Sequence, residues 1–197
     1  MPDHALRVYE SVLEMHSNAE NPTPIVRLHR VIPFQHTKVY AKLEWYNPFG
    51  AVKDRVAASL IADAEARGET LDNLVEPTSG NTGMGLAMMS NARGYHFTAT
   101  LSNQIPLEKR QALRLFGTNL IELNDDLCPM PGQPEGAMVR AATMGAEPGW
   151  KSLNQYKKPA NPEAHFKTTG PEVWKQTEGE LDAFVRVGYL GQCRHKG

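Results

Sequence analysis

The sequence of 197 residues predicts an α/β protein with a three-layer arrangement, in which helices cover both faces of doubly wound parallel sheets. Three observations favour this class. Short apolar runs alternate with segments of helical periodicity along most of the chain. The predicted helices stop near glycines such as Gly68 and Gly117. No repeat or low-complexity tract interrupts the order. Strict alternation implies right-handed crossovers between parallel strands.

The first third of the chain is expected to contain two helices, an extended segment and a strand. Apolar residues recur at helical spacing over residues 4–15. The segment NPTPIVRL reads as extended, and KVYAKLEW alternates as a strand that ends at the turn signal Asn47-Pro48. From Val52 to Ala64 the apolar residues form one face of a helix that stops near Gly68.

The rest of the chain continues the alternation. The expected strands read NLVEPT, FTATLS, NLIEL, KSLNQY and DAFVRV. The expected helices lie at about 82–93, 106–117, 136–144 and 161–176, the last one interrupted at Gly170-Pro171. A loop that contains CPMPGQPEG precedes the helix at 136–144.

Composition excludes several classes of function. The formal net charge of −1 gives no electrostatic reason to expect a nucleic-acid partner or an anionic membrane surface. The acidic residues near the N-terminus interrupt what would have to be the apolar core of a secretory signal. Cys128 and Cys193 cannot form a disulfide framework and have no partner at metal-ligand spacing, so we expect a reducing cytoplasm and no metal site.

The segment EPTSGNTGMG, Glu76 to Gly85, follows a predicted strand and opens a helix. Its glycines allow a tight turn, and its hydroxyl and amide side chains lie beside the free N–H groups of the helix start. The segment therefore predicts a cradle for an anion. A plain strand-to-helix turn with a capping residue is the alternative. A dinucleotide loop fits poorly, because the glycines do not follow G-x-G-x-x-G.

Lys53 lies in the first turn of a predicted helix, in the stretch YNPFGAVKDRVA. The positive end of the helix dipole and packing against apolar neighbours would both lower the pKa of its amine. A neutral amine is a nucleophile suited to Schiff-base chemistry with a carbonyl cofactor. Alternatively, Lys53, Asp54 and Arg55 are simply the charged residues of an exposed first turn.

Three segments in order, NPFGAVKDR, EPTSGNTG and NQYKKPANPEAHFKTTGPEVW, resemble the cysteine synthase and cystathionine β-synthase family. This family comprises fold-type II pyridoxal-phosphate enzymes with a tryptophan synthase β-like fold. Its O-acetylserine and O-phosphoserine sulfhydrylases replace the Cβ substituent of an activated serine with sulfide and so make L-cysteine. The N-terminal YESVLEMHSNAENPTPIVRL is similar as well, so the resemblance extends to Val185.

The resemblance implies a role for individual residues. Lys53 matches the lysine that holds pyridoxal 5′-phosphate covalently and moves the α-proton, and Asn81 matches the asparagine that hydrogen-bonds the cofactor's phenolic oxygen. The groups that grip the substrate carboxylate in the family match Thr78, Ser79, Gly80, Thr82 and Gln155. The resemblance also implies an amino-acid substrate, sulfide and a homodimer if the chain is intact.

The pattern departs from the family after Val185, where a glycine- and threonine-rich phosphate loop is expected and RVGYLGQCRHKG stands instead. We therefore expect an incomplete large domain and weak cofactor binding. The expected division is 1–45 in the large domain, 46–155 as the small α/β domain, 156–185 as the return to the large domain and 186–197 as a divergent tail. A frameshift in the gene is one hypothesis for that tail.

Two other functions stay open beside the cysteine synthase reading. One is a β-eliminating lyase or serine/threonine dehydratase, which would use the same Lys53 and the same cradle. The other is a catalytically silent truncated fragment that acts by binding.

Overall fold

The protein folds around a four-stranded sheet in the order β5–β4–β3–β6, and every pair of neighbours in it is parallel. The computed structural model describes residues 8–30, 33, 36–78, 80–124 and 136–185. The strands are β3 (Asn73–Pro77), β4 (His96–Ser102), β5 (Asn119–Leu123) and β6 (Trp150–Ser152). The predicted α/β class with a parallel sheet is therefore confirmed.

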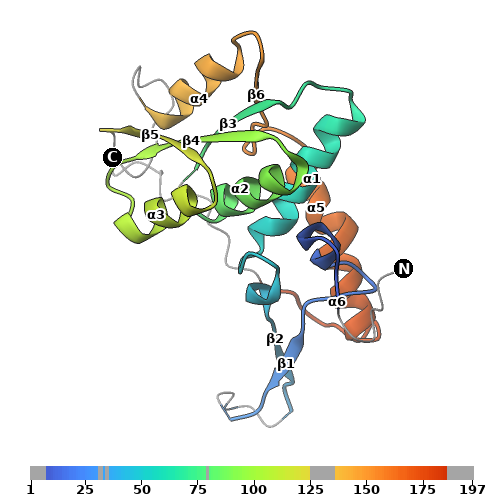
Figure 1. The fold of residues 1–197 in the computed structure, drawn as a ribbon. Helices are drawn as coiled ribbons and strands as arrows, with labels where there is room; N and C mark the ends of the chain where they lie inside the picture. Colours follow the sequence, from blue (N-terminus) through green and yellow to red (C-terminus); the bar gives the residue numbers. More distant parts are fainter. Residues whose placement is uncertain (1–7, 31–32, 34–35, 79, 125–135, 186–197) are drawn as a thin grey trace.

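Helices cover both faces of this sheet, which gives the three predicted layers (Figure 1). Three of them lie on one face and α4 lies on the other. The helices are α1 (Lys53–Ala66), α2 (Asn81–Arg93), α3 (Leu107–Leu115) and α4 (Ala137–Gly145). Their positions agree with the expected ranges to within two residues, because glycines with positive φ, Gly68, Gly94 and Gly117, follow the ends of α1, α2 and α3.

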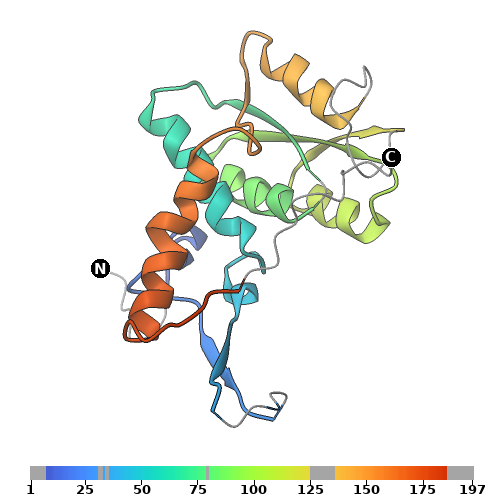
Figure 2. The same ribbon diagram turned by 180° about the vertical axis from the view of Figure 1, so that it is seen from behind.

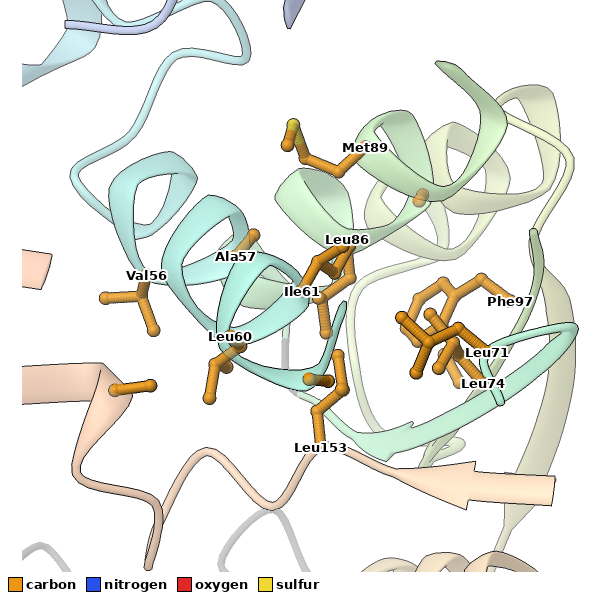
Figure 3. Packing of buried hydrophobic residues seen from close by; sticks show 14 of the residues in the cluster. Val56, Ala57, Leu60, Ile61, Leu71, Leu74, Leu86, Met89, Phe97 and Leu153 are labelled. Atoms are coloured by element: carbon orange, nitrogen blue, oxygen red, sulfur yellow. The ribbon is translucent and has the colours of Figure 1, made fainter. Parts of the chain in front are cut away.

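The main core lies between the sheet and the helices α1 and α2 (Figure 3). Leu60 and Ile61 of α1 and Leu86 of α2 are almost fully buried there. Side chains alternate along β4: Phe97 joins this core, whereas the Thr100 hydroxyl donates to the Ala137 carbonyl at the start of α4, at 2.7 Å. The period of two in FTATLS therefore separates an apolar face from a face that carries hydroxyls.

The N-terminal part forms a small arm of two strands, β1 (Ile25–Leu28) and β2 (Val39–Lys42). They pair antiparallel, separately from the main sheet (Figure 1). The one-turn helix η2 (Glu44–Tyr46) follows β2. The expected helix over 4–15 is wrong where the structure describes it, because only the turn η1 (Val12–Met15) is helical. None of its residues is buried, and so short a helix is marginal without packing.

The segment after β6 differs from two expectations. The expected strand KSLNQY ends at Ser152, and Asn154 takes a positive φ of 52°. The expected break at Gly170-Pro171 is absent: α5 (Ala160–Ala164), the π-helical turn η3 (His165–Thr169) and α6 (Gly170–Gln176) form one rod (Figure 2). Pro171 has no N–H for the carbonyl four residues earlier, and a widened π turn just before it accommodates this loss.

The expected last strand, DAFVRV, is wrong for residues 182–185, which the structure describes as irregular and exposed. Its remaining two residues, 186 and 187, lie outside the described residues, as do the rest of the tail and Cys128. A strand requires a neighbour, and no described segment pairs with Phe184 or Val185. Within the described residues, no helix is long and apolar enough to cross a membrane.

Candidate functional site

The loop that joins β3 to α2 is closed by the side chain of Thr78. The buried Thr78 hydroxyl oxygen accepts hydrogen bonds from the Gly80 N–H at 3.2 Å and the Gly83 N–H at 2.9 Å. Gly80 has a φ of 148°, a conformation that other residues rarely adopt. A Cβ on Gly83 would lie 2.6 Å from the Thr78 methyl carbon. Thr78, Gly80 and Gly83 of the TSGNTG segment thus make so tight a turn possible.

The start of α2 faces this turn with the polar groups that an anion needs. Asn81, the first residue of α2, is exposed, and Thr82 is buried. Helix geometry leaves the first N–H groups of α2 without intrahelical acceptors, and the helix dipole makes this end positive. Ser79, which was also predicted for the site, lies outside the described residues.

Lys53 is the first residue of α1 and is half-buried. The helix that carries it packs directly on the first turns of α2. A Cβ built on Gly85 would lie 3.4 Å from the Lys53 carbonyl oxygen and 2.9 Å from the Ala57 Cβ. The absence of a side chain at Gly85 therefore lets the two helix starts, one with Lys53 and the other with Asn81, lie against each other.

Asp54 and Arg55 are not surface charges, which corrects the alternative reading of an exposed first turn. They are 0% and 3% exposed. One Asp54 carboxylate oxygen accepts from the Phe49 N–H at 2.8 Å and from the Ala51 N–H at 3.5 Å, so it fixes the loop that leads to Lys53. Burial raises the pKa of Asp54 to about 6, although these two N–H groups favour the ionised form.

Arg55 forms the centre of a buried ionic network. Its guanidinium binds both oxygens of Glu172, which is 0% exposed, and binds Glu44 at 2.8 and 3.0 Å. Lys42 adds a second cation 2.8 Å from Glu172. Although burial opposes ionisation of Glu44, the hydrogen bonds from Arg55 hold its pKa below the ordinary value. The network joins α1 to β2, η2 and α6.

Glu76, at the buried end of β3, fixes the position of Gln155. Its carboxylate accepts from the backbone N–H of Asn154 at 2.8 Å and of Gln155 at 2.7 Å. The Gln155 side chain in turn donates to the Pro77 carbonyl at 2.9 Å. Burial raises the pKa of Glu76 even though these N–H groups favour its charged form. Gln155 therefore lies beside the loop that Thr78 closes.

An open pocket of about 170 Å³ lies between the first turns of α2 and α3. Gly80, Asn81 and Met84 line it from α2, and Glu108, Lys109 and Ala112 line it from α3. The structure thus brings the described site residues Thr78, Gly80, Asn81 and Thr82 to one loop and helix start, with Gln155 and the start of α1 beside them.

Sequence reasoning missed the carboxylates that support this arrangement. Glu76 lies in an otherwise apolar strand, and a charged residue in such a strand indicates a buried partner. That signal was available in NLVEPT. Glu172 carries no comparable signal, because acidic residues in first helical turns are ordinary.

The described site combines a half-buried lysine with a turn of threonine, glycine and asparagine, each at the start of one of two packed helices beside a parallel sheet. The chain belongs to the pyridoxal-phosphate-dependent enzyme family, whose model matches residues 16–191. It is 42% identical over 165 residues to cysteine synthase B of Salmonella typhimurium, covering 83% of this chain and 53% of that protein. The cysteine synthase of Staphylococcus aureus is also 42% identical, with 83% of this chain and 52% of that protein covered.

Solved structures agree with this assignment. Cysteine synthase from Entamoeba histolytica superposes with a TM-score of 0.77 at 30% identity, covering 89% of this chain and 52% of that one. An O-ureido-L-serine synthase superposes with a TM-score of 0.76 at 38% identity, covering 88% and 52%. The predicted family and its fold-type II architecture are confirmed. The chain spans about half the length of the relatives it matches.

Proposed function

We propose that this chain carries the small-domain half of a cysteine synthase site, which replaces the Cβ substituent of O-acetylserine or O-phosphoserine with sulfide to make L-cysteine. The observation that supports this most directly is the packing of the start of α1, with Lys53, on the start of α2 at Gly85. The cysteine synthases among its relatives support the same reaction.

The described residues fit pyridoxal phosphate at its aldehyde end. Lys53 would hold the cofactor, because its half-buried amine lies at a helix start where a positive charge is disfavoured. Asn81, exposed at the start of α2, would donate to the phenolic oxygen. When bound, pyridoxal phosphate withdraws electrons from the α-carbon of an amino acid.

The protein's own groups then have separate tasks. Thr78, Thr82 and Gln155, together with Ser79, would bind the α-carboxylate and so orient the α-hydrogen, while Gly80, with a φ of 148°, allows the turn at which they meet. The amine of Lys53 would take up the α-proton, as a general base must do within hydrogen-bond reach.

The experiment that tests this function is a trapping reaction. The purified protein is mixed with pyridoxal 5′-phosphate, reduced with borohydride and digested, and the labelled peptide is identified by mass spectrometry. We expect the label on Lys53, with an absorption band near the edge of the visible range before reduction. The exposed Lys38 provides the matched control. Lys53→Ala should abolish both signals and Lys38→Ala should leave both unchanged. Colour and label that survive Lys53→Ala would contradict the proposal.

A second measurement separates the synthase from the alternatives. With O-acetylserine and sulfide, a cysteine synthase forms cysteine, whereas a β-eliminating lyase releases pyruvate whether or not sulfide is present. A silent fragment forms neither. We further propose that the protein acts in the cytoplasm on small molecules, and that it forms a homodimer when the whole family fold is present.

A further inference from the structure

We propose that Lys109 is a further substrate-recognition residue, whose ammonium contributes to binding the α-carboxylate of the amino-acid substrate at the Gly80–Asn81 turn. This inference rests on the proposed function, because that function places the carboxylate at this turn. It extends the site from the β3–α2 loop to α3, which none of the sequence motifs included.

The Lys109 side chain lies against Gly80. A Cβ built on Gly80 would lie 3.4 Å from the Lys109 Cδ and 3.6 Å from its Nζ. The lysine therefore extends across the one residue of the turn that has no side chain of its own. Together with Asn81 and Ala112, the two residues line the open pocket between α2 and α3.

The positive charge of Lys109 lies close to the positive ends of two helices. Lys109 lies in the first turn of α3, where the helix dipole disfavours a cation. The start of α2 on the other side of the pocket is also positive. Within the described part of the chain, no hydrogen bond or ion pair engages the Lys109 ammonium, whereas the neighbouring Arg110 and Arg114 both bind Glu122. The exposed Glu108 is the acidic residue of the pocket.

The charges around this pocket favour an anionic ligand. Two positive helix starts and an unpaired ammonium converge on a pocket that opens to solvent, and a carboxylate placed there would lower the repulsion among them. Thr78 already occupies the Gly80 and Gly83 N–H groups, so these two are not available to the ligand. The Lys109 ammonium would therefore bind a carboxylate at this turn more strongly than the remaining backbone N–H groups would alone.

The experiment compares two ligands that differ in the carboxylate, without cofactor and without turnover. L-serine and L-serinamide are titrated into the ¹⁵N-labelled protein, and the amide signals of Gly80 and Asn81 report binding. We expect the wild-type protein to prefer L-serine. Lys109→Gln should reduce this preference about three- to fivefold, the size expected of a solvent-accessible ion pair. Lys109→Arg should keep most of it.

The matched control is Lys38→Gln, which removes the same charge from the exposed residue directly before β2. The arm of β1 and β2 lies far from α3 (Figure 1). It should leave the preference unchanged. Equal preference in Lys109→Gln and in the wild-type protein would overturn the role of Lys109. Absence of any preference in the wild-type protein would overturn both Lys109 and the carboxylate cradle. The borohydride label on Lys53 is independent of both outcomes, so failure of the proposed function is recognised separately.

Discussion

Asp54 is the residue next to the candidate nucleophile, and the fold opposes the ionisation of its carboxyl group. One of its oxygens holds the loop at Phe49 and Ala51, while the other is buried and has no hydrogen-bond partner in the described structure. A buried oxygen without a partner makes the charged form costly. This explains why the pKa of Asp54 rises from 3.8 to about 6.

A pH-dependent stability follows from this carboxyl group. Between about pH 4 and 6 the folded protein holds the Asp54 proton more tightly than the unfolded chain does, so the free energy of unfolding falls as the pH rises. The stabilisation is fully present below the unfolded pKa and is lost as the pH passes the folded pKa of about 6.

Asp54→Asn should remove this dependence. Urea unfolding at a series of pH values should show the stability of the wild-type protein relative to Asp54→Asn falling by about 2 kcal/mol from pH 4 to pH 7. The other carboxylates are common to both proteins and cancel in the difference. A difference that stays constant over this range would show that Asp54 ionises normally in the fold.

At the scale of elements, the contact between α1 and α2 decides where Lys53 lies. Gly85 and Ala57 meet at this contact, where a Cβ on Gly85 would come 2.9 Å from the Ala57 Cβ. So short a separation cannot be accommodated without moving one helix. The distance between the helix starts is therefore fixed by two small residues.

Gly85→Ala should destabilise the protein by about 1–3 kcal/mol through overpacking, and it should slow the labelling of Lys53. The sign of the change in unfolding free energy is informative, because replacing glycine by alanine at an unhindered helix position would instead stabilise the protein by about 1 kcal/mol. Urea unfolding measures the first effect and borohydride trapping the second.

Ala57→Gly restores the space and provides the control. The double variant Ala57→Gly/Gly85→Ala should be less destabilised than the sum of the two single variants. Additive effects would mean that the two residues do not share the contact, and the account of the helix packing would then be wrong.

At the scale of the whole molecule, the buried ionic network ties distant parts of the chain together. Arg55 of α1 and Glu172 of α6 are separated by 117 residues, yet the Arg55 guanidinium binds the Glu172 carboxylate directly. Lys42 brings the N-terminal arm to the same carboxylate. The long rod of α5, η3 and α6 is thus joined to α1 close to Lys53.

Glu172→Ala should cost about 3–5 kcal/mol in urea unfolding, because it leaves two buried cations with fewer partners. Glu163→Ala is the matched control, since Glu163 precedes Glu172 in the same rod and pairs with Lys167 in solvent, with both side chains about half-exposed or more. Its loss should cost about 0.5 kcal/mol or less. Similar costs for the two variants would rule out a stabilising role for the network.

Large apolar side chains are exposed in η2 and at the end of the described chain, as they are on α3 and on the rod of α5, η3 and α6. Trp45, Tyr46, Phe184 and Val185 are all more than 60% exposed.

The sequence by itself determined the order of elements from β3 to α4, since apolar periodicity and glycine stop signals are local properties of NLVEPT, FTATLS and the helices between them. It also indicated the family, because three motifs in order specify both the loop at Thr78–Thr82 and the lysine at 53. Their roles in binding remain predictions.

Only the tertiary structure decided which charges are buried and which strand-like segments find a partner. The sequence is compatible with an exposed turn at Asp54 and Arg55, but both residues are buried in the structure, against the loop at Phe49 and against α6. The segment DAFV has the pattern of a strand, but no described strand lies beside it. The burial of Arg55 depends on Glu172, 117 positions away, and a strand depends on a neighbour that local sequence does not specify. Local periodicity does not indicate such distant partners. For the same reason the sequence did not predict that Glu172 is buried, although its carboxylate binds Arg55 and Lys42 in the fold.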